Sequence, residues 1–152
     1  MPDIVAPDVR SRMMAAIRGT NTKPELTLRR GLHALGFRFR LHDHRLPGRP
    51  DLVFPKFRAV IFAHGCFWHG HDCHLFRMPS TRPDFWEAKI SRNREVDRRA
   101  ADALSELGWR QGVVWECALK GRCRLPLEKV IGDCAAWLCS DAPLLEIKGR
   151  DI

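Results

Sequence analysis

The sequence lacks any run of about 18 apolar residues, and residues 1–19 contain no apolar stretch of the kind that a secretory signal needs. We therefore expect neither membrane insertion nor export, and we expect a cytoplasmic protein. The sequence also lacks a C-x-x-C pair, which weakens the case for a thiol redox protein. Internal repeats and low-complexity linkers are missing as well, which favours one continuous unit.

Negative charge is scarce relative to positive charge. The chain has 18 Asp and Glu against 26 Lys and Arg, a formal net charge of +8. Such a surplus usually serves a polyanionic partner such as nucleic acid, and the alternative is a basic surface that is only solvated. With 152 residues, 45% of them hydrophobic, the chain can form one compact core. We therefore expect a single domain over 1–152, and a monomer because no second apolar surface is evident.

The hydrophobic pattern predicts alternating helices and strands. We expect helices over 8–18, 22–36, 83–107 and 127–138, and strands over 37–41, 52–54, 59–63 and 109–115. The second helix should begin at a capping box, ThrLysProGlu at 22–25, and residues 141–152 should fray. The predicted fold class is α/β, with a mixed central sheet flanked by helices.

The helix over 83–107 should be capped by Ser80 or Thr81 and should end at Gly108. Its apolar stripe comprises Phe85, Val96, Ala100, Ala103, Leu104 and Leu107, and the same stripe contains Trp86, Lys89 and Asn93. Burying an unpaired lysine and asparagine would cost several kcal/mol, so the first half of the helix is interpreted as facing a cleft or a ligand. The alternative is that it overhangs the core and is solvated.

The segment FAHGCFWHGHDCH, residues 62–74, holds four histidines, two cysteines and an aspartate in thirteen positions. Thiolate and imidazole are the usual ligands of structural zinc. The predicted zinc ligands are Cys66, His71, Cys73 and Cys117, because the strands before Cys66 and Cys117 would bring them together if they are neighbours. The spacing is unlike that of common zinc fingers, so reduced cysteines remain an alternative. Cys123 is an alternative fourth ligand, and Cys134 and Cys139 are interpreted as core thiols.

His64, His69 and His74 are left over by this assignment, and Asp51 stands at the head of a predicted strand. A carboxylate that holds a divalent metal and a histidine that takes a proton from water would suit phosphodiester hydrolysis. The loop is therefore interpreted as serving a structural zinc site and a catalytic site. The alternative is a set of surface histidines with an N-cap aspartate.

Four motifs carry a resemblance that spans nearly the whole chain. They are ProGlyArgProAsp (47–51), ValIlePheAlaHisGlyCysPheTrpHis (60–69), PheTrp-x-x-LysIle (85–90) with Asn93, and ValTrpGluCysAlaLeu (114–119). These motifs resemble the very-short-patch-repair (Vsr) mismatch endonucleases. The resemblance implies a fold related to type II restriction endonucleases and a nick in duplex DNA on the 5′ side of the thymine in a T·G mismatch. It implies DNA repair after deamination of 5-methylcytosine, and partnership with a cytosine C5-methyltransferase and with mismatch-repair proteins.

The resemblance also implies roles for particular residues. Asp51 and the backbone carbonyl of Ala63 would bind catalytic Mg²⁺, His69 would be the general base and His64 a second catalytic histidine. The zinc ligands would be the four residues proposed above. Glu25 would lie beside the metal site, although as the last residue of the capping box it could also bond only the backbone of Thr22.

Two departures accompany the resemblance. A family member has threonine where this chain has Ala63, but a role played by a carbonyl survives that change. The acidic-x-Lys signature of restriction enzymes is missing after Asp51, as it is in the family generally, so histidines would replace the lysine.

Mismatch recognition is expected to use aromatic wedges, because a T·G pair stacks poorly and its flanking steps deform easily. Phe67 and Trp68 lie between two histidines, and the resemblance adds Trp86 and Met14, although Met14 could equally pack on the core. Lys89 and Asn93 have the donors and acceptors to read base edges in the major groove. The arginines expected to supply phosphate contacts are Arg10, Arg12, Arg18, Arg29, Arg30, Arg92, Arg94, Arg98 and Arg99, and several of them are expected to form salt bridges along their helices instead.

The sequence therefore predicts a magnesium-dependent, strand-specific mismatch endonuclease with structural zinc, acting on nucleoid DNA. The alternative from another class is a zinc-stabilised module that binds distorted duplex DNA without cutting it. Asp51, His64 and His69 argue against that alternative, because binding alone needs none of them.

Overall fold

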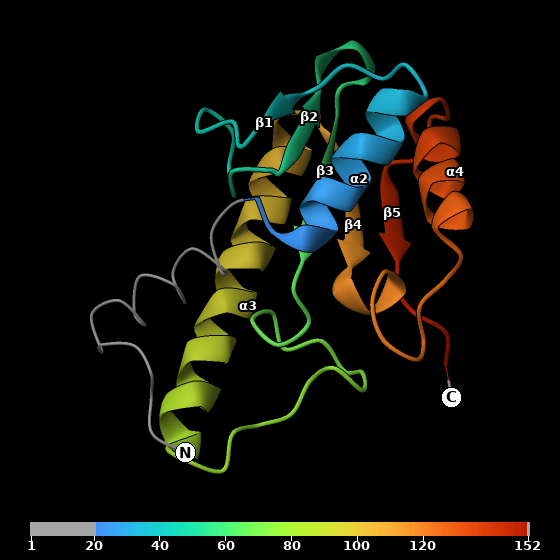
Figure 1. The fold of residues 1–152 in the computed structure, drawn as a ribbon. Helices are drawn as coiled ribbons and strands as arrows, with labels where there is room; N and C mark the ends of the chain where they lie inside the picture. Colours follow the sequence, from blue (N-terminus) through green and yellow to red (C-terminus); the bar gives the residue numbers. More distant parts are fainter. Residues whose placement is uncertain (1–20, 152) are drawn as a thin grey trace.

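The computed structural model describes residues 21–151, in which one sheet carries helices on both faces (Figure 1). The strands are β1 (Arg40–Leu41), β2 (Leu52–Phe54), β3 (Ala59–His64), β4 (Arg110–Trp115) and β5 (Leu144–Ile147). The helices are α2 (Lys23–Ala34), α3 (Pro83–Glu106) and α4 (Leu127–Leu138), with short 3-10 helices η1 (Pro55–Phe57) and η2 (Glu116–Ala118). None of the described helices is long and apolar enough to cross a membrane. The helix expected over 8–18, which includes Met14, lies outside the described residues.

The sheet is mixed, as the sequence predicted. Its strand order is β1-β2-β3-β4-β5, with β1, β2 and β3 antiparallel and β3, β4 and β5 parallel. The parallel pair β3 and β4 runs in register from Ala59 and Arg110 to His64 and Trp115. The loops that follow these two strands therefore leave from the same edge of the sheet.

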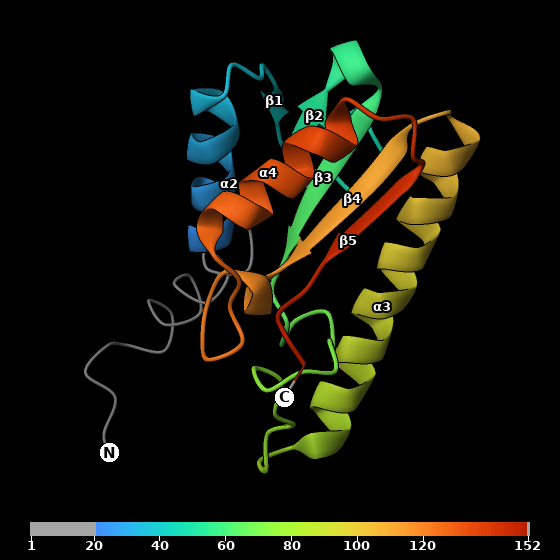
Figure 2. The same ribbon diagram turned by 90° about the vertical axis from the view of Figure 1, so that its right-hand side faces the viewer.

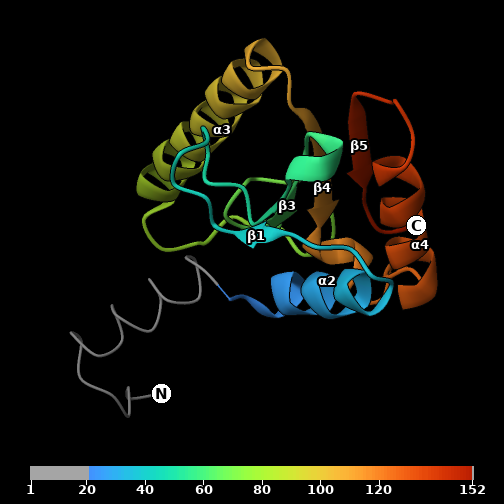
Figure 3. The same cartoon turned by 90° about the horizontal axis from the view of Figure 1, so that it is seen from above.

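The helices form a layer on each face of this sheet, with α2 and α4 on one side and α3 on the other (Figures 2 and 3). Strand side chains alternate between the two layers. Leu52 and Ile61 belong to the larger core with α2 and α4, whereas Val53 and Val60 contact Leu104 of α3 in a smaller core. The two cores leave the end of the sheet beyond His64 to polar groups.

Helix α2 begins as the capping box predicted, with one difference. The Thr22 side chain accepts a hydrogen bond from the Glu25 N–H at 3.4 Å, and proline stands in the first turn. The Glu25 carboxylate, however, accepts from the N–H of Asn21 at 3.2 Å and not from that of Thr22. Glu25 is 1% exposed, and its carboxylate also contacts Arg29 and His42, so its role goes beyond capping the helix.

Helix α3 has the predicted length, but its buried face is rotated relative to the predicted stripe. Phe85, Val96 and Leu107 are 45%, 55% and 52% exposed, so their placement in the core was wrong. The buried residues are Ile90, Ala100 and Leu104. At 100° per residue this face also carries Trp86, Asn93 and Asp97, because it lies toward one edge of the predicted stripe.

The first half of α3 extends past the sheet, and the loop that follows β3 packs beside it (Figure 2). Helix α3 lines a cavity of about 750 Å³ from Arg94 onward, with Asp97 among its residues, whereas Trp86, Lys89 and Asn93, the residues predicted to face a cleft, do not line it. Trp86 and Asn93 instead contact Trp68 in the loop after β3. The cap is not the predicted Ser80 or Thr81. Arg82 occupies the N-cap in the left-handed region, at φ 54°, without a side-chain capping bond, and Gly108 ends the helix at φ 84°.

Three further expectations need correction. The strand expected over 37–41 is reduced to β1, because Phe37 and Phe39 pack on the core without pairing to a neighbouring strand. The tail does not fray over its whole length, since β5 pairs with β4 and buries Ile147 at 5% exposure. Cys134 is a core thiol as predicted, but Cys139 is exposed because it caps the end of α4.

Candidate functional site

Three groups of side chains with metal-ligand chemistry lie at the edge where β3 and β4 end. Within each group, one candidate ligand atom per residue lies within 4.8 Å of the others. The groups are Cys66, His71, Cys73 and Cys117; His64, His69 and Asp97; and Glu25, His42 and Asp51. All three depend on the loop after β3 or on strands that pair with β3, so one edge of the sheet positions them.

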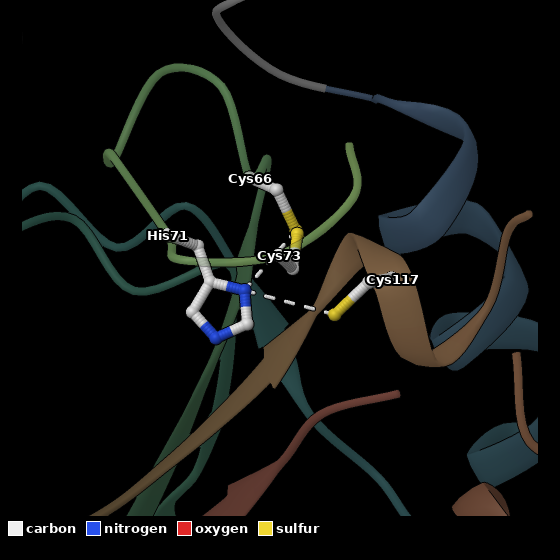
Figure 4. A group of neighbouring side chains, drawn as sticks. All are labelled: Cys66, His71, Cys73 and Cys117. Carbon is white, nitrogen blue, oxygen red and sulfur yellow. Dashed lines mark hydrogen bonds between the residues drawn. The ribbon is translucent and has the colours of Figure 1, made fainter. Parts of the chain in front are cut away.

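The first group is the set of four residues that the sequence predicted as zinc ligands, and Figure 4 shows their side chains converging. His71 Nδ1 lies 3.5 Å from Cys66 Sγ and 3.6 Å from Cys117 Sγ. Cys123, the alternative fourth ligand, is buried but stands outside this group. The parallel pairing of β3 with β4 brings Cys117 to the other three residues, so the four could hold a metal ion.

Neighbouring groups hold this cluster in place. The His71 ring stacks on Trp115, with centroids 4.1 Å apart and planes at 6°. The Cys66 N–H donates to the Glu116 carboxylate at 3.2 Å, and the Gly149 N–H donates to Cys117 Sγ at 3.3 Å. Burial raises the pKa of the Cys66 and Cys117 thiols above the usual range, so without a cation the buried sulfurs stay protonated.

The second group joins two histidines to an acid on α3. His69 Nδ1 lies 2.5 Å from Asp97 Oδ2, and the His64 and His69 rings stack with centroids 3.8 Å apart and planes at 7°. Burial, with the nearby His69, lowers the pKa of His64 to about 3, so His64 is neutral at neutral pH. Its Nδ1 is buried and has no hydrogen-bond partner among the described residues.

The third group places two carboxylates together at the start of β2. His42 Nε2 lies 2.7 Å from Glu25 Oε2, and Asp51 Oδ2 accepts from the Ala63 N–H at 2.7 Å. Burial raises the pKa of Asp51 to about 7, and the neighbouring Glu25 adds to this effect while the Ala63 N–H opposes it. The buried carboxylates of Asp51 and Glu25 repel each other when both are charged, so a cation bound between them would be stabilising.

A cleft of about 750 Å³ connects the second and third groups. Its walls include Asp51, Ala63, His64, His69 and Asp97. His74 lines no part of this cleft: its Nε2 is buried next to Gly121, without a hydrogen-bond partner among the described residues. Of the residues left over by the zinc assignment, the fold therefore gathers Asp51, His64 and His69 at one cleft and leaves His74 elsewhere.

The rings of Phe67, Trp68 and Trp86, predicted as the aromatic wedge, lie in contact with one another. The Phe67 ring lies 5.0 Å from Trp68 and 5.4 Å from Trp86 between centroids, and Phe76 stacks on Phe67 at 6.1 Å. Asn93 Nδ2 donates to the Trp68 carbonyl at 2.8 Å, so this asparagine anchors the loop that carries the wedge. Met14 lies outside the described residues.

Four of the nine arginines expected to contact phosphates have partners within the protein. Arg29 pairs with Glu25 at 3.0 Å, and Arg98 and Arg99 pair with Glu95 at 2.6 and 3.1 Å. Arg94 donates to the backbone carbonyls of His69 and Gly70. Arg30 and Arg92 are exposed, and the other three, Arg10, Arg12 and Arg18, lie outside the described residues.

Sequence reasoning missed three participants: Asp97, His42 and Trp115. A signal was available for Asp97, because it stands four residues after Asn93 and so extends the polar face of the helix. No comparable pattern marks His42, which reaches Glu25 only because β1 pairs with β2. Trp115 reads as a buried strand residue, and its stacking on His71 depends on the loop conformation.

The chain matches the family model described as DNA mismatch endonuclease Vsr over residues 2–75. It is 45% identical to DNA mismatch endonuclease Vsr of Escherichia coli (strain K12) over 152 residues, covering 100% of this chain and 97% of the relative. It is 50% identical over 119 residues to the type II nicking enzyme V.XorIIP of Xanthomonas oryzae pv. oryzae, covering 78% and 88% of the two chains. The type II nicking enzyme V.NmeAIP of Neisseria meningitidis is 41% identical over 133 residues, covering 86% and 95%. The chain therefore belongs to the DNA mismatch endonuclease Vsr family.

Proposed function

We propose that this DNA mismatch endonuclease nicks duplex DNA on the 5′ side of the thymine in a T·G mismatch and that it depends on Mg²⁺. The observation that carries the proposal is the cleft that a histidine–aspartate pair, His69 and Asp97, lines together with Asp51, beside which Glu25 is buried. A proton acceptor and a cation site in one cleft are what phosphodiester hydrolysis needs. The aromatic cluster beside this cleft suits a substrate whose base stack is weakened.

Asp51 and the Ala63 carbonyl would hold the magnesium ion, with Glu25 close by. The N–H and C=O of one strand residue face the same neighbouring strand, so the Ala63 carbonyl is on the same side of β3 as Asp51, which bonds its N–H. The raised pKa of Asp51 is the mark of a buried carboxyl group that lacks a counter-ion. When bound, the cation would stabilise the negative charge that develops on the attacked phosphate.

His69 would act as the general base. Asp97 fixes the ring through Nδ1, which leaves Nε2 as the nitrogen that accepts a proton from water. The carboxylate then stabilises the imidazolium that forms. His64 is neutral and stacked on His69, so it would donate a hydrogen bond to the phosphate and keep the base in its orientation.

Structural Zn²⁺ fits the group of Cys66, His71, Cys73 and Cys117, because three thiolates and one imidazole are a common zinc ligand set. Burial lowers the pKa of His71, so the ring is neutral and available as a ligand. The Glu116 carboxylate bonds the Cys66 N–H and the Gly149 N–H bonds Cys117 Sγ, and hydrogen bonds of this kind orient ligands in metal sites.

Mismatch recognition would combine the wedge with base reading. Phe67, Trp68 and Trp86 would enter the weakened stack from the major groove, and Met14 would enter from the minor groove. Lys89 and Asn93 line the same face of α3 and would read the base edges. Because Asn93 already donates to the Trp68 carbonyl, it would couple the position of the wedge to the reading of the pair.

The biological setting follows from this substrate. T·G pairs arise where 5-methylcytosine deaminates, so the enzyme would accompany a cytosine C5-methyltransferase and mismatch-repair proteins and would work as a monomer on nucleoid DNA in the cytoplasm. The mixed sheet with a carboxylate at the head of β2 supports a fold related to type II restriction endonucleases. A non-catalytic module that binds distorted duplex is the weaker candidate, because binding alone does not require a histidine oriented by a carboxylate, as His69 is by Asp97.

The test is cleavage of end-labelled duplexes that carry one T·G pair in randomised flanks, with Mg²⁺ or with chelator, beside matched duplexes. We expect a Mg²⁺-dependent nick 5′ of the thymine in the T·G duplexes alone. Asp51→Ala should bind these duplexes with unchanged affinity and lose the nick. Tight binding by the parent protein without a nick in any flank would favour the non-catalytic module, and cutting by Asp51→Ala would refute the metal assignment.

The raised pKa of Asp51 predicts a pH-dependent cost in the protein without magnesium. The pKa is about 7 in the folded protein and 3.8 ordinarily, so the folded state holds this proton more tightly than the unfolded state does. The free energy of unfolding should therefore fall as pH rises from 3.8 through 7. Asp51→Asn should therefore melt at least a few degrees higher than the parent at pH 8 and show little gain at pH 4. For a chain of this size each kcal/mol of unfolding free energy shifts the melting temperature by about 2–4 °C. Added Mg²⁺ should raise the melting temperature of the parent and of a control with an intact site, but not that of Asp51→Asn. The exposed Asp141→Asn is the control, and an equal Mg²⁺ response in Asp51→Asn would contradict the assignment.

Asp97 is predicted to act by positioning His69. Asp97→Asn should lower kcat by about 10²–10⁴-fold, because the ring loses its orienting carboxylate, while the dissociation constant for the T·G duplex stays the same. Single-turnover cleavage and equilibrium binding measure the two quantities separately. Asp102→Asn, on the exposed face of the same helix, should leave both unchanged. A parallel loss of affinity in Asp97→Asn would point to a structural role instead.

Gly149 is predicted to be necessary for tight metal binding. An added Cβ would lie 2.6 Å from the Cys117 carbonyl oxygen and 2.8 Å from that of Cys123, so Gly149→Ala must move the N–H away from Cys117 Sγ. Loss of a hydrogen bond to a ligand atom costs about 10–100-fold in metal affinity, which chelator competition for Zn²⁺ measures. Gly132→Ala, where no atom lies within 4 Å of the added Cβ, is the control. Equal zinc retention in both variants would show that the bond is unimportant.

A further inference from the structure

A basic surface that the mechanism does not use lies next to the cysteine cluster. Its members are Arg122, which follows η2, and Lys148 and Arg150, which follow β5; we call these three residues the C-terminal basic surface. They line a cavity of about 300 Å³ together with Cys117 and Cys123. The surface therefore joins two segments that are far apart in the sequence.

The backbone of this surface is anchored. Besides the bond from the Gly149 N–H to Cys117 Sγ, the Arg150 N–H donates to the Cys123 carbonyl at 2.7 Å. The close approach at Gly149 leaves no room for a side chain. The positions of Lys148 and Arg150 are consequently set by the cysteine cluster, although these residues stand at the end of the chain.

Within residues 21–151 the cations of this surface have no ion-pair partner. Asp72 and Asp151 line the same cavity, but among these residues no carboxylate oxygen lies within 4.0 Å of a charged nitrogen of Arg122, Lys148 or Arg150. The Arg150 guanidinium donates to the Arg124 carbonyl at 3.0 Å, which holds the side chain without neutralising its charge. The helix arginines differ, since Arg98 and its neighbour on α3 are paired with acidic residues one turn away. The charge of the surface is therefore available to an anionic partner.

The surface continues from the catalytic cleft. His71 and Asp72 line both the cleft and the second cavity, so the two share a wall. In Figure 1 the C-terminal segment ends at the same edge of the sheet as the loop that follows β3. A duplex seated with its scissile phosphate near Asp51 would therefore extend toward Lys148 and its neighbours on one side.

We propose that the C-terminal basic surface binds the phosphate backbone of the duplex in one flank of the mismatch. The inference rests on the proposed function for the position of the scissile phosphate. Contacts to phosphates carry no sequence information, so this surface supplies affinity and orientation and leaves discrimination to the aromatic cluster and α3. It would compensate for the helix arginines that are paired within the protein.

The test compares two charge-matched double variants. In Arg122→Gln/Lys148→Gln two members of the surface lose their charge, and neither side chain makes a hydrogen bond within residues 21–151. Arg38→Gln/Lys56→Gln removes the same charge at a different cavity, where these residues line the wall with Leu35 and Phe57. Dissociation constants for T·G and matched duplexes are measured over a range of salt concentrations.

We expect the slope of log K against log salt to become shallower by roughly 1.8 in the first variant, at about 0.9 for each lost phosphate contact, and to change little in the control. The loss of affinity should be equal for T·G and matched duplexes. Shortening the duplex on one flank, and on one flank only, should abolish the difference between the parent and the first variant. Equal slopes in the two double variants, or a difference that survives truncation of either flank, would overturn the proposal. Failure of the parent to prefer or nick T·G duplexes would count against the proposed function and would leave the salt comparison interpretable.

Discussion

Six residue pairs, from Ala59 with Arg110 to His64 with Trp115, hold β3 and β4 side by side and in parallel. Because the strands run in the same direction, the segments that follow them leave from one edge, and Cys117 meets the loop that carries Cys66 and His71. The antiparallel pairing of β2 with β3 brings Asp51 to the Ala63 N–H at the same edge. The cysteine cluster and the carboxylate site therefore depend on one sheet register. A slip by one residue would turn the side chains of the slipped strand to the other face and displace the segment that follows it.

Burying polar groups at this edge of the sheet costs desolvation free energy, and the protein offsets this cost in three ways. Glu25 is satisfied by Asn21, Arg29 and His42, and His69 is satisfied by Asp97. Burial raises the pKa of Cys66, Cys117 and Asp51, which favours their neutral, protonated forms. His64 stays neutral. Any metal ion bound by such groups would displace protons, which would link its binding to stability.

Helix α3 connects the histidine cleft with the aromatic cluster. Its second half packs on the sheet through Leu104, and its first half extends past the sheet beside the loop after β3. Along one face it supplies Asp97 to the histidine pair, Asn93 to the Trp68 carbonyl and Trp86 to the aromatic cluster. One helix thereby sets the position of the aromatic cluster relative to the cleft, and under the proposed function this spacing would select the phosphate that is attacked.

Much of this arrangement was predictable from local patterns. The capping box of α2, the strand Leu52–Phe54, the length of α3 and the ligand-type residues between Cys66 and Cys73 follow from periodicity, capping and side-chain chemistry, which are properties of neighbouring residues. The stripe of α3 was misplaced because a helix with apolar residues on two adjacent faces does not reveal which face packs. The strand β5 was missed because a short edge strand is stabilised by its partner and has little pattern of its own.

The sequence by itself determined the fold class and the positions of most elements, through hydrophobic periodicity. It also indicated the kinds of side chain in the site, because clustered cysteines and histidines are the usual ligands of metal ions. Only the tertiary structure decided which of these residues meet. It joined Cys117 and not Cys123 to the loop, gave His69 the carboxylate of Asp97, placed His42 on Glu25 and anchored Gly149 on the cysteine cluster. These contacts join residues 17 to 46 positions apart, and chain entropy leaves such separations unspecified until strand pairing and helix packing bring them together.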